Sequence, residues 1–399
     1  MKIIYIHQYF VTPNEGGAVR SYYLAKGMVE AGIEVDMITA HNEDYYDLKI
    51  IDGIKVHYLP VAYDNSFGFL KRGRSFMSFV SQAKKLIPKL PRPELLYISS
   101  TPLTTGIIGL WAKRKYALPF IFEVRDLWPE APIQMGAVSN PLLKGMLYKL
   151  EERIYKNALK IVALSPGIKN YIEKKTAKEK VFLIPNFADT SFFHPIKKTN
   201  PGKFTISYAG AIGQVNALEE FLELAQQAKQ QGRDWQFVMM GKGASLPTLM
   251  KEADDMGLDN LKFEPFGSKE KVREVLQNSD MVYISFAHLP VLKTNSPNKF
   301  FDALAMGKPL IVNHKGWVQE LIHTHQLGIY YNAKQADASW KKLCDFVDNS
   351  QKLIDAGKRA RDLGDNYFSS EMAVKRVLHV LDPQKHPYKI SDGVYILTA

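Results

Sequence analysis

Short hydrophobic runs alternate with stretches of helical periodicity along the whole chain. In the first half, strands are predicted at residues 2–8, 34–40, 54–60, 95–99, 118–124, 159–164 and 181–185. In the second half, they are predicted at residues 204–210, 235–241, 260–264, 280–285, 309–313 and 328–331. Amphipathic helices are predicted between most of these strands, for example at residues 17–31, 104–116, 140–158, 215–231 and 245–256. This alternation is typical of parallel sheets flanked by helices.

The alternation occurs twice, and a polar stretch at residues 197–202 separates the two series as a linker would. A chain of 399 residues is also longer than the chains that usually fold around a single hydrophobic core. We therefore predict an α/β fold of two Rossmann-like doubly wound domains facing a cleft, at residues 1–197 and 198–368. A final helix and an aromatic tail, residues 369–399, are predicted to pack back toward the first domain. Ligands are expected at the carboxyl ends of the strands.

The positive charge of the chain is concentrated in its first half. Residues 1–199 contain 28 Lys and Arg against 18 Asp and Glu, whereas residues 200–399 contain 24 against 23. Basic clusters at residues 71–74, 84–85 and 113–115 are interleaved with apolar side chains, a pattern typical of helices that lie on an anionic membrane surface. Solvated charge is the alternative, and no nucleic-acid-binding module is recognisable.

The ends and the cysteine content point to a cytoplasmic protein. No apolar run reaches the roughly 18 to 20 residues that span a bilayer. The first residues read as a strand without the small-residue cleavage site of a signal peptide. The single Cys344 excludes an internal disulfide and fits a reducing compartment.

Residues 296–309 contain the most informative segment of the chain. Ser296 is predicted as the N-cap of a short helix, Pro297 fits its first turn, and Gly307 suits its end. The free N–H groups of residues 298–300 would attract an anion, and Lys299 adds a full positive charge. The segment therefore predicts a phosphate cradle, although an ordinary helix start is the alternative.

Each half also begins with a strand that leads into a glycine-containing loop. In the first half, Gly16 and Gly17 precede Arg20, which could pair with a phosphate. In the second half, Gly210 and Gly213 follow the strand. Neither loop has the Gly-x-Gly-x-x-Gly pattern of dinucleotide-binding proteins, and each could be only a tight turn.

Residues 122–130 combine three carboxylates and one guanidinium directly after a predicted strand. Glu123 or Asp126 could accept a proton or orient a hydroxyl, with Arg125 beside them. An ion pair that serves only the fold is the alternative. The chain contains no Asp-x-Asp triplet, so we expect no divalent cation to bridge a nucleotide diphosphate and no other cofactor.

These motifs together resemble GT-B glycosyltransferases of family 4, in particular the bacterial group that builds O-antigen and capsule repeat units. The resemblance covers nearly the whole chain. Its anchors are residues 16–17, 123–129, 163–167, 184–186, 210–213, 241–243 and 296–309. Members of the family transfer a sugar from a nucleotide diphosphate with retention and without a metal. The resemblance implies a donor site in the second domain, with Gly241, Lys242, Ser296, Pro297 and Asn298 around the nucleotide and Asp302 at its ribose.

The chain departs from the family pattern at two places. Thr294 stands where the family has the first of two paired carboxylates, and Ala211 and Val215 or their neighbours replace an Arg and a Lys that grip the diphosphate. The family's active-site histidine falls on or beside Arg125 and Asp126. Lys299 and the amides of residues 298–300 are the expected substitutes at the diphosphate.

The resemblance implies a retaining transferase that uses a nucleotide-sugar donor, most simply a UDP-sugar, and a lipid-linked or polysaccharide acceptor. Such an enzyme would be cytoplasmic and bound peripherally to the inner face of the membrane, where its basic first domain would meet the anionic acceptor. Two other interpretations stay open: a nucleotide-sugar epimerase-like enzyme that needs no acceptor, and an inactive protein that binds sugar nucleotides.

Overall fold

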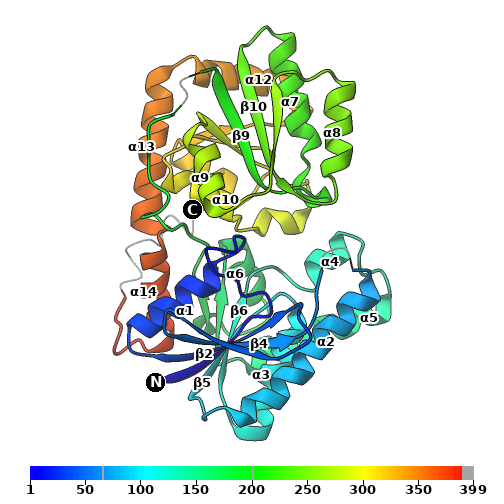
Figure 1. Ribbon diagram of the computed structural model, residues 1–399, viewed down its shortest axis with the longest axis vertical. Helices are drawn as coiled ribbons and strands as arrows, with labels where there is room; N and C mark the ends of the chain where they lie inside the picture. Colours follow the sequence, from blue (N-terminus) through cyan, green and yellow to red (C-terminus); the bar gives the residue numbers. More distant parts are fainter. Residues whose placement is uncertain (65–66, 200–201, 389–399) are drawn as a thin grey trace. The chain divides into compact units, whose positions relative to one another are not determined.

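The computed structural model describes residues 1–64, 67–199 and 202–388, which form two α/β units (Figure 1). The first unit contains Met1–Pro13 and Gly17–Pro185, and the chain enters the second unit at Asn186. It returns to the first unit at Ala373, whereas Asn14–Gly16 group with the second unit. The crossing at Asn186 precedes the predicted linker, of which residues 200–201 lie outside the described residues; Tyr395 of the predicted aromatic tail does so too.

The first unit is built on an eight-stranded sheet of order β3-β4-β2-β1-β5-β6-β7-β8, in which β3 alone is antiparallel to its neighbour. The strands are β1 (Lys2–Ile6), β2 (Glu34–His41), β3 (Asp47–Ile51), β4 (Ile54–Pro60), β5 (Leu95–Ser99), β6 (Phe120–Val124), β7 (Lys160–Ala163) and β8 (Val181–Leu183). The strand order reverses between β1 and β5, which makes the carboxyl ends of these two strands the expected ligand position.

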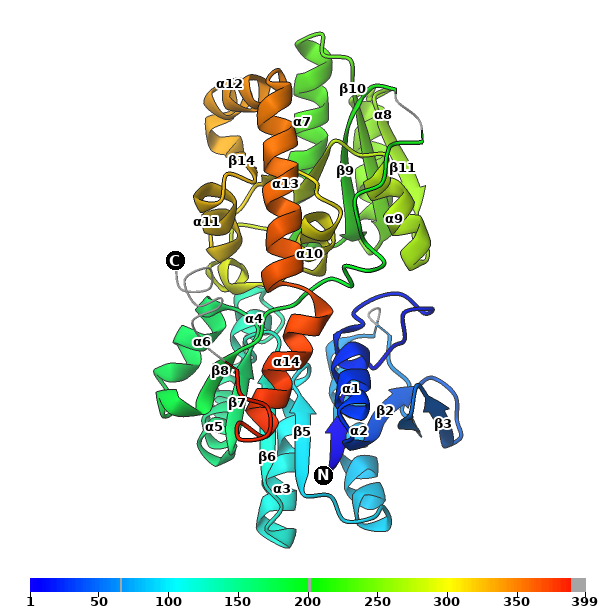
Figure 2. The ribbon, with the colours of Figure 1, turned by 90° about the vertical axis from the view of Figure 1, so that its left-hand side faces the viewer.

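Helices cover both faces of this sheet. They are α1 (Arg20–Glu30), α2 (Phe69–Leu86), α3 (Gly106–Tyr116), α4 (Glu130–Gln134), α5 (Pro141–Asn157), α6 (Pro166–Glu173) and α14 (Ser370–Leu381). Figures 1 and 2 show α14 beside α1, on the face opposite to α2 and α3. The contact is tight, because a Cβ added at Gly27 in α1 would lie 2.4 Å from Val374 in α14. Helix α14, the last helix of the described residues, is thus part of the first unit's core.

The second unit is built on a fully parallel six-stranded sheet of order β11-β10-β9-β12-β13-β14. Its strands are β9 (Phe204–Ala211), β10 (Trp235–Lys242), β11 (Leu261–Pro265), β12 (Met281–Ile284), β13 (Leu310–Val312) and β14 (Gly328–Tyr330). Its helices are α7 (Glu219–Gln230), α8 (Leu246–Asp255), α9 (Lys269–Gln277), α10 (Asn298–Ala305), α11 (Trp317–Thr324), α12 (Ala336–Val347) and α13 (Ser350–Tyr367). Its strand order reverses between β9 and β12, so ligands are expected at their carboxyl ends.

The structure confirms the predicted α/β class with two Rossmann-like units, and all of the predicted strands to within a few residues at their ends. The pattern missed β3, an edge strand whose Leu48 and Ile50 are exposed. Because β3 pairs only with β4, it does not show the buried run of a central strand. Within the described residues, no helix is both long enough and apolar enough to cross a membrane.

Candidate active site

Lys299 lies at the reversal point of the second unit's sheet. It stands in the first turn of α10, and its ammonium donates a hydrogen bond to the Tyr208 hydroxyl of β9 at 2.7 Å. The same ammonium lies 4.1 Å from the centre of the Tyr208 ring and 5.3 Å from that of Phe286, which follows β12. No carboxylate of the described residues lies within ion-pair distance of it. Burial without an acidic partner lowers the pKa of Lys299 to about 7.

Two predicted glycines allow close packing at this end of the sheet, and the first of them lies against Lys299. A Cβ at Gly210 would lie 3.0 Å from Cε of Lys299, so the lysine packs directly against the strand. Gly241, its register partner on β10, has φ +156°, and a Cβ there would lie 1.9 Å from the Gly210 carbonyl oxygen. Only glycine therefore fits at position 241. The structure therefore brings Lys299, Gly210 and Gly241 together, as the sequence predicts.

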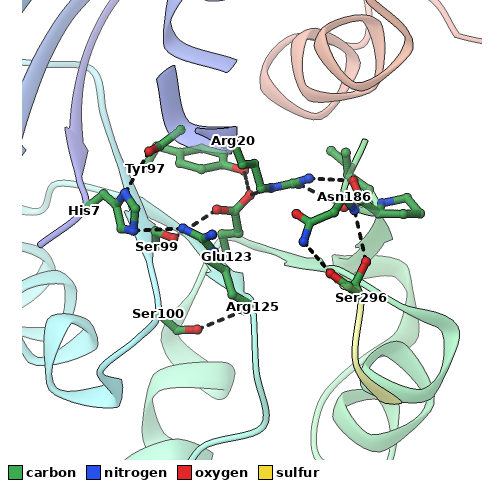
Figure 3. A network of polar contacts seen from close by, with 12 residues as sticks. His7, Arg20, Tyr97, Ser99, Ser100, Glu123, Arg125, Asn186 and Ser296 are labelled. Atoms are coloured by element: carbon green, nitrogen blue, oxygen red, sulfur yellow. Dashed lines mark hydrogen bonds and ion pairs between the residues drawn. The ribbon is translucent and has the colours of Figure 1, made fainter. Parts of the chain in front are cut away.

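The start of α10 differs from the prediction. Pro297, not Ser296, is the N-cap residue, and no side chain caps the helix. The Ser296 hydroxyl instead accepts a hydrogen bond from the backbone N–H of Asn186 at 3.2 Å, and the Asn186 amide donates to the Ser296 carbonyl at 2.6 Å (Figure 3). Asn186 therefore fixes the segment that leads into α10. The predicted N-cap is wrong because this hydroxyl binds a partner distant in sequence. The N–H of Asn298, the first helical residue, lacks a side-chain cap.

Asp302 lies one turn further along α10 and is partly buried. Burial raises the pKa of its carboxyl to about 7, with Lys269 opposing the shift and Asp189 adding to it. Lys269 itself is bonded to Asp189 at 2.9 Å. Asp302 therefore changes its charge near neutral pH, and a ribose hydroxyl would be a suitable hydrogen-bond partner in either state.

The remaining predicted residues of the second unit lie around the ends of β9 and β10. The Gly213 N–H donates to the Asn216 side chain at 3.3 Å, which closes the turn after β9. Lys242 is exposed, and its ammonium lies 4.1 Å from the centre of the Phe266 ring. Gly16 has φ +72°, and a Cβ there would lie 3.9 Å from Phe266.

In the first unit, Glu123 binds Arg20 rather than facing a ligand. The Arg20 Nε donates to Glu123 Oε1 at 2.9 Å, and its two terminal nitrogens donate to the carbonyls of Pro185 and Ile184 (Figure 3). Tyr97 and Ser99 also donate to the Glu123 carboxylate, each at 3.0 Å.

This pair is almost completely buried, with exposed fractions of 3% for Arg20 and 0% for Glu123. Burial alone would raise the pKa of Glu123, but Arg20 and Arg125 outweigh it and lower the pKa below its usual range. Glu123 is therefore a carboxylate that holds Arg20. In place of the predicted phosphate, the Arg20 guanidinium binds this carboxylate and the end of the first unit's chain.

Arg125 and the buried His7 form a second pair beside this network. Arg125 donates from its guanidinium to Nε2 of His7 at 2.9 Å, and Nδ1 of His7 lies 2.8 Å from the Ser21 hydroxyl (Figure 3). Because arginine can only donate, Nε2 is the acceptor and Nδ1 carries the proton. Burial and the Arg125 charge hold the pKa of His7 well below its usual value. His7 is therefore neutral at physiological pH.

Asp126 and Gly17 complete the set of predicted residues in the first unit. Asp126 is partly exposed; burial raises the pKa of its carboxyl, and the Arg125 charge opposes this shift. Gly17 has φ +89°, which suits the turn that leads into α1. Unlike the buried Glu123, Asp126 thus has a carboxylate that a ligand could reach.

The predicted site did not include His7, Tyr208 or Asn186, although Asn186 belongs to the family anchor at residues 184–186. His7 is the first residue after β1, at the carboxyl end of a central strand, and this position was a usable signal. Tyr208 lies within a hydrophobic strand, where the sequence pattern alone does not separate a site residue from a core residue. Among the described residues, no group of three or more His, Cys, Asp or Glu side chains could hold a metal ion.

Comparisons with known proteins bear on the family and the fold of the chain. Residues 15–186 match the model of a glycosyl transferase 4-like domain, and residues 189–363 match that of glycosyl transferases group 1. A putative colanic acid biosynthesis glycosyl transferase, WcaI of Escherichia coli, is 26% identical over 164 residues, which are 37% of this chain and 38% of that protein. The aligned part thus spans little more than a third of that relative.

Solved structures resemble nearly the whole chain. A sucrose-phosphate synthase from Thermosynechococcus elongatus superimposes with a TM-score of 0.78 at 16% identity, over 96% of this chain and 99% of that one. HepE of Anabaena, solved in complex with UDP-glucose, gives a TM-score of 0.69 at 15% identity, with the same coverage. The two α/β units thus match structures of the GT-B fold.

Proposed function

The chain is a GT-B protein that joins a glycosyl transferase 4-like domain to a glycosyl transferases group 1 domain, and we propose that it is a retaining glycosyltransferase. Its donor is a nucleotide diphosphate sugar, most simply a UDP-sugar, and its acceptor is a lipid-linked or polysaccharide glycan of the cell surface. The UDP-glucose complex of HepE, which shares the fold, supports this donor class.

The observation that supports the proposal most strongly is the position of Lys299. Its ammonium is partly buried, has no acidic partner among the described residues, and stands where the order of the strands reverses. A leaving diphosphate would supply the missing negative charge. The free N–H groups at the start of α10 point in the direction that favours anions. A lysine and amide dipoles would then perform the work that an Asp-x-Asp-bound cation performs elsewhere.

In the proposed reaction, an acceptor hydroxyl attacks the anomeric carbon on the face from which the diphosphate departs. The bond between that carbon and the β-phosphate oxygen breaks, and the acceptor's proton passes to the leaving phosphate. The protein contributes charge stabilisation, orientation and exclusion of water. Asp302 would hold the ribose. Asp126 would orient the acceptor hydroxyl, and neutral His7 with Arg125 would fix the adjacent backbone.

Contact with a membrane is proposed for helix α2. Leu70 and Met77 are 77% and 50% exposed, and they share one face of the helix with Arg74 and Lys85. Apolar side chains among basic ones favour the surface of an anionic bilayer. The enzyme would act at the cytoplasmic face of the membrane, where a lipid diphosphate acceptor displays its charge.

Two measurements test the proposed reaction. Titration with UDP in the presence of a chelator should show binding, and a requirement for a divalent cation would contradict the metal-free donor site. Incubation with UDP-sugars and a lipid diphosphate-linked acceptor should give a product with the donor's anomeric configuration. An inverted product would contradict retention, and an epimer formed from the donor alone would favour an epimerase.

A further inference from the structure

A cavity of about 260 Å³ lies at the carboxyl ends of β12, β13 and β14. The Phe286 ring lies between it and Lys299, with its centre 5.0 Å from that of His314 in the lining and 5.3 Å from the Lys299 ammonium. Its polar lining consists mainly of His288, Lys293, His314, Lys315, Asn332 and Lys334. These residues come from the segments that follow the three strands and from the turn before α10. None of the predicted site residues lines it.

The cavity contains positive charge that the protein does not neutralise. Lys293, Lys315 and Lys334 are exposed, and their ammonium groups have no acidic partner among the described residues. The Glu220 carboxylate contacts the lining residue His288, and each of its two oxygens already has a hydrogen-bond partner. Oε1 lies 2.7 Å from His288 Nε2, and Oε2 accepts from Asn313 at 3.1 Å. Three like charges around one cavity favour an anionic ligand.

His314 adds a directed hydrogen-bond acceptor to the wall of the cavity. It is 3% exposed, and its Nδ1 lies 3.3 Å from the Asn313 side-chain oxygen. This oxygen also accepts from the Phe286 backbone N–H at 3.0 Å, which fixes the orientation of the amide. Nδ1 of His314 therefore carries the proton, and Nε2 presents a lone pair with no partner in the described part of the chain.

We propose that this cavity binds a phosphate group, either as hydrogen phosphate or as a sugar phosphate, at a site separate from the donor diphosphate. The lysines meet the negative oxygens, and Nε2 of His314 accepts a hydrogen bond from the ligand's hydroxyl. A carboxylate alone offers fewer negative oxygens and no hydroxyl donor. The cavity has room for a hexose phosphate.

Calorimetric titration of the full chain with inorganic phosphate and with glucose 1-phosphate tests the site, with glucose as the uncharged control. We expect a dissociation constant of about 1 mM or below for each phosphate ligand. Lys315→Ala and Lys334→Ala should each weaken it about threefold, and the triple variant with Lys293→Ala at least about tenfold. Lys251→Ala, on the surface of α8, is the matched control and should change nothing. These lysines are exposed, so the variants should fold.

Phosphate binding within about twofold of its original strength in the presence of saturating UDP would support a separate site. Tighter binding of glucose 1-phosphate than of inorganic phosphate would identify a sugar phosphate as the ligand, and equal binding would identify the phosphate group alone. Displacement by UDP, the absence of binding, or binding that the lysine variants leave unchanged would overturn the proposal. None of these results depends on whether the chain transfers a sugar.

Discussion

Replacement of Lys299 by alanine should abolish most of the activity and leave the fold intact. The ammonium has Tyr208 as its hydrogen-bond partner, and the Tyr208 hydroxyl also donates to the Ala211 carbonyl at 2.5 Å. The substitution therefore leaves no buried carboxylate unpaired, and the free energy of unfolding should change by no more than about 1 kcal/mol. The lost charge at the leaving diphosphate should raise the activation free energy by about 2–4 kcal/mol, a rate loss of about 10²–10³.

The assay is the release of UDP from a UDP-sugar in the presence of acceptor, together with calorimetric binding of UDP and a thermal unfolding curve. Lys299→Arg keeps the charge, and Lys251→Ala is a surface control on the same unit. Turnover and UDP affinity of folded Lys299→Ala within about twofold of the original protein would refute the role of this lysine.

The same lysine makes a prediction about pH. Its pKa of about 7 means that the free protein loses this charge as the pH rises through 7. A diphosphate binds the charged form, so UDP affinity should fall above pH 7, by at most about tenfold per pH unit. Asp302 titrates in the same range, so Lys299→Arg is needed as the comparison. Arginine stays protonated, and a fall of equal size in that variant would assign the effect to another group.

Three further predictions concern stability and the membrane. Glu123→Gln should lower the free energy of unfolding by about 3–5 kcal/mol, because it leaves the buried Arg20 guanidinium without its counter-charge; chemical denaturation measures this, and a cost below 1 kcal/mol would contradict it. Gly241→Ala should prevent the second unit from folding normally, as judged by circular dichroism, since its Cβ would overlap a carbonyl of β9; a native spectrum and melting curve would contradict this. Leu70→Ser with Met77→Ser should reduce sedimentation with anionic vesicles at low salt, and unchanged sedimentation would remove α2 from the membrane contact.

The fold could be predicted well because each strand of the parallel sheets is a short buried run between amphipathic helices. The site could be predicted only in part. Lys299, Gly210 and Gly241 could be predicted because each belongs to a local pattern at a strand or helix end. The partner of Arg20 could not be predicted, because Glu123 is 103 residues away and no local pattern separates a phosphate-binding arginine from a buried one. The prediction that Ser296 is the N-cap was wrong for the same reason, because its hydrogen-bond partner Asn186 lies 110 residues earlier.

Helix α14 has a consequence for how the protein is made. The sheet of the first unit contains β1, near residue 1, yet the side chains that cover Gly27 and its neighbours belong to α14, where Ala373, Val377 and Val380 are buried. The whole second unit must therefore be synthesised before the first can finish its core. A fragment that stops at Pro185 would leave uncovered the apolar surface on which α14 packs, so the first unit should be expressed with α14 joined to it by a designed linker.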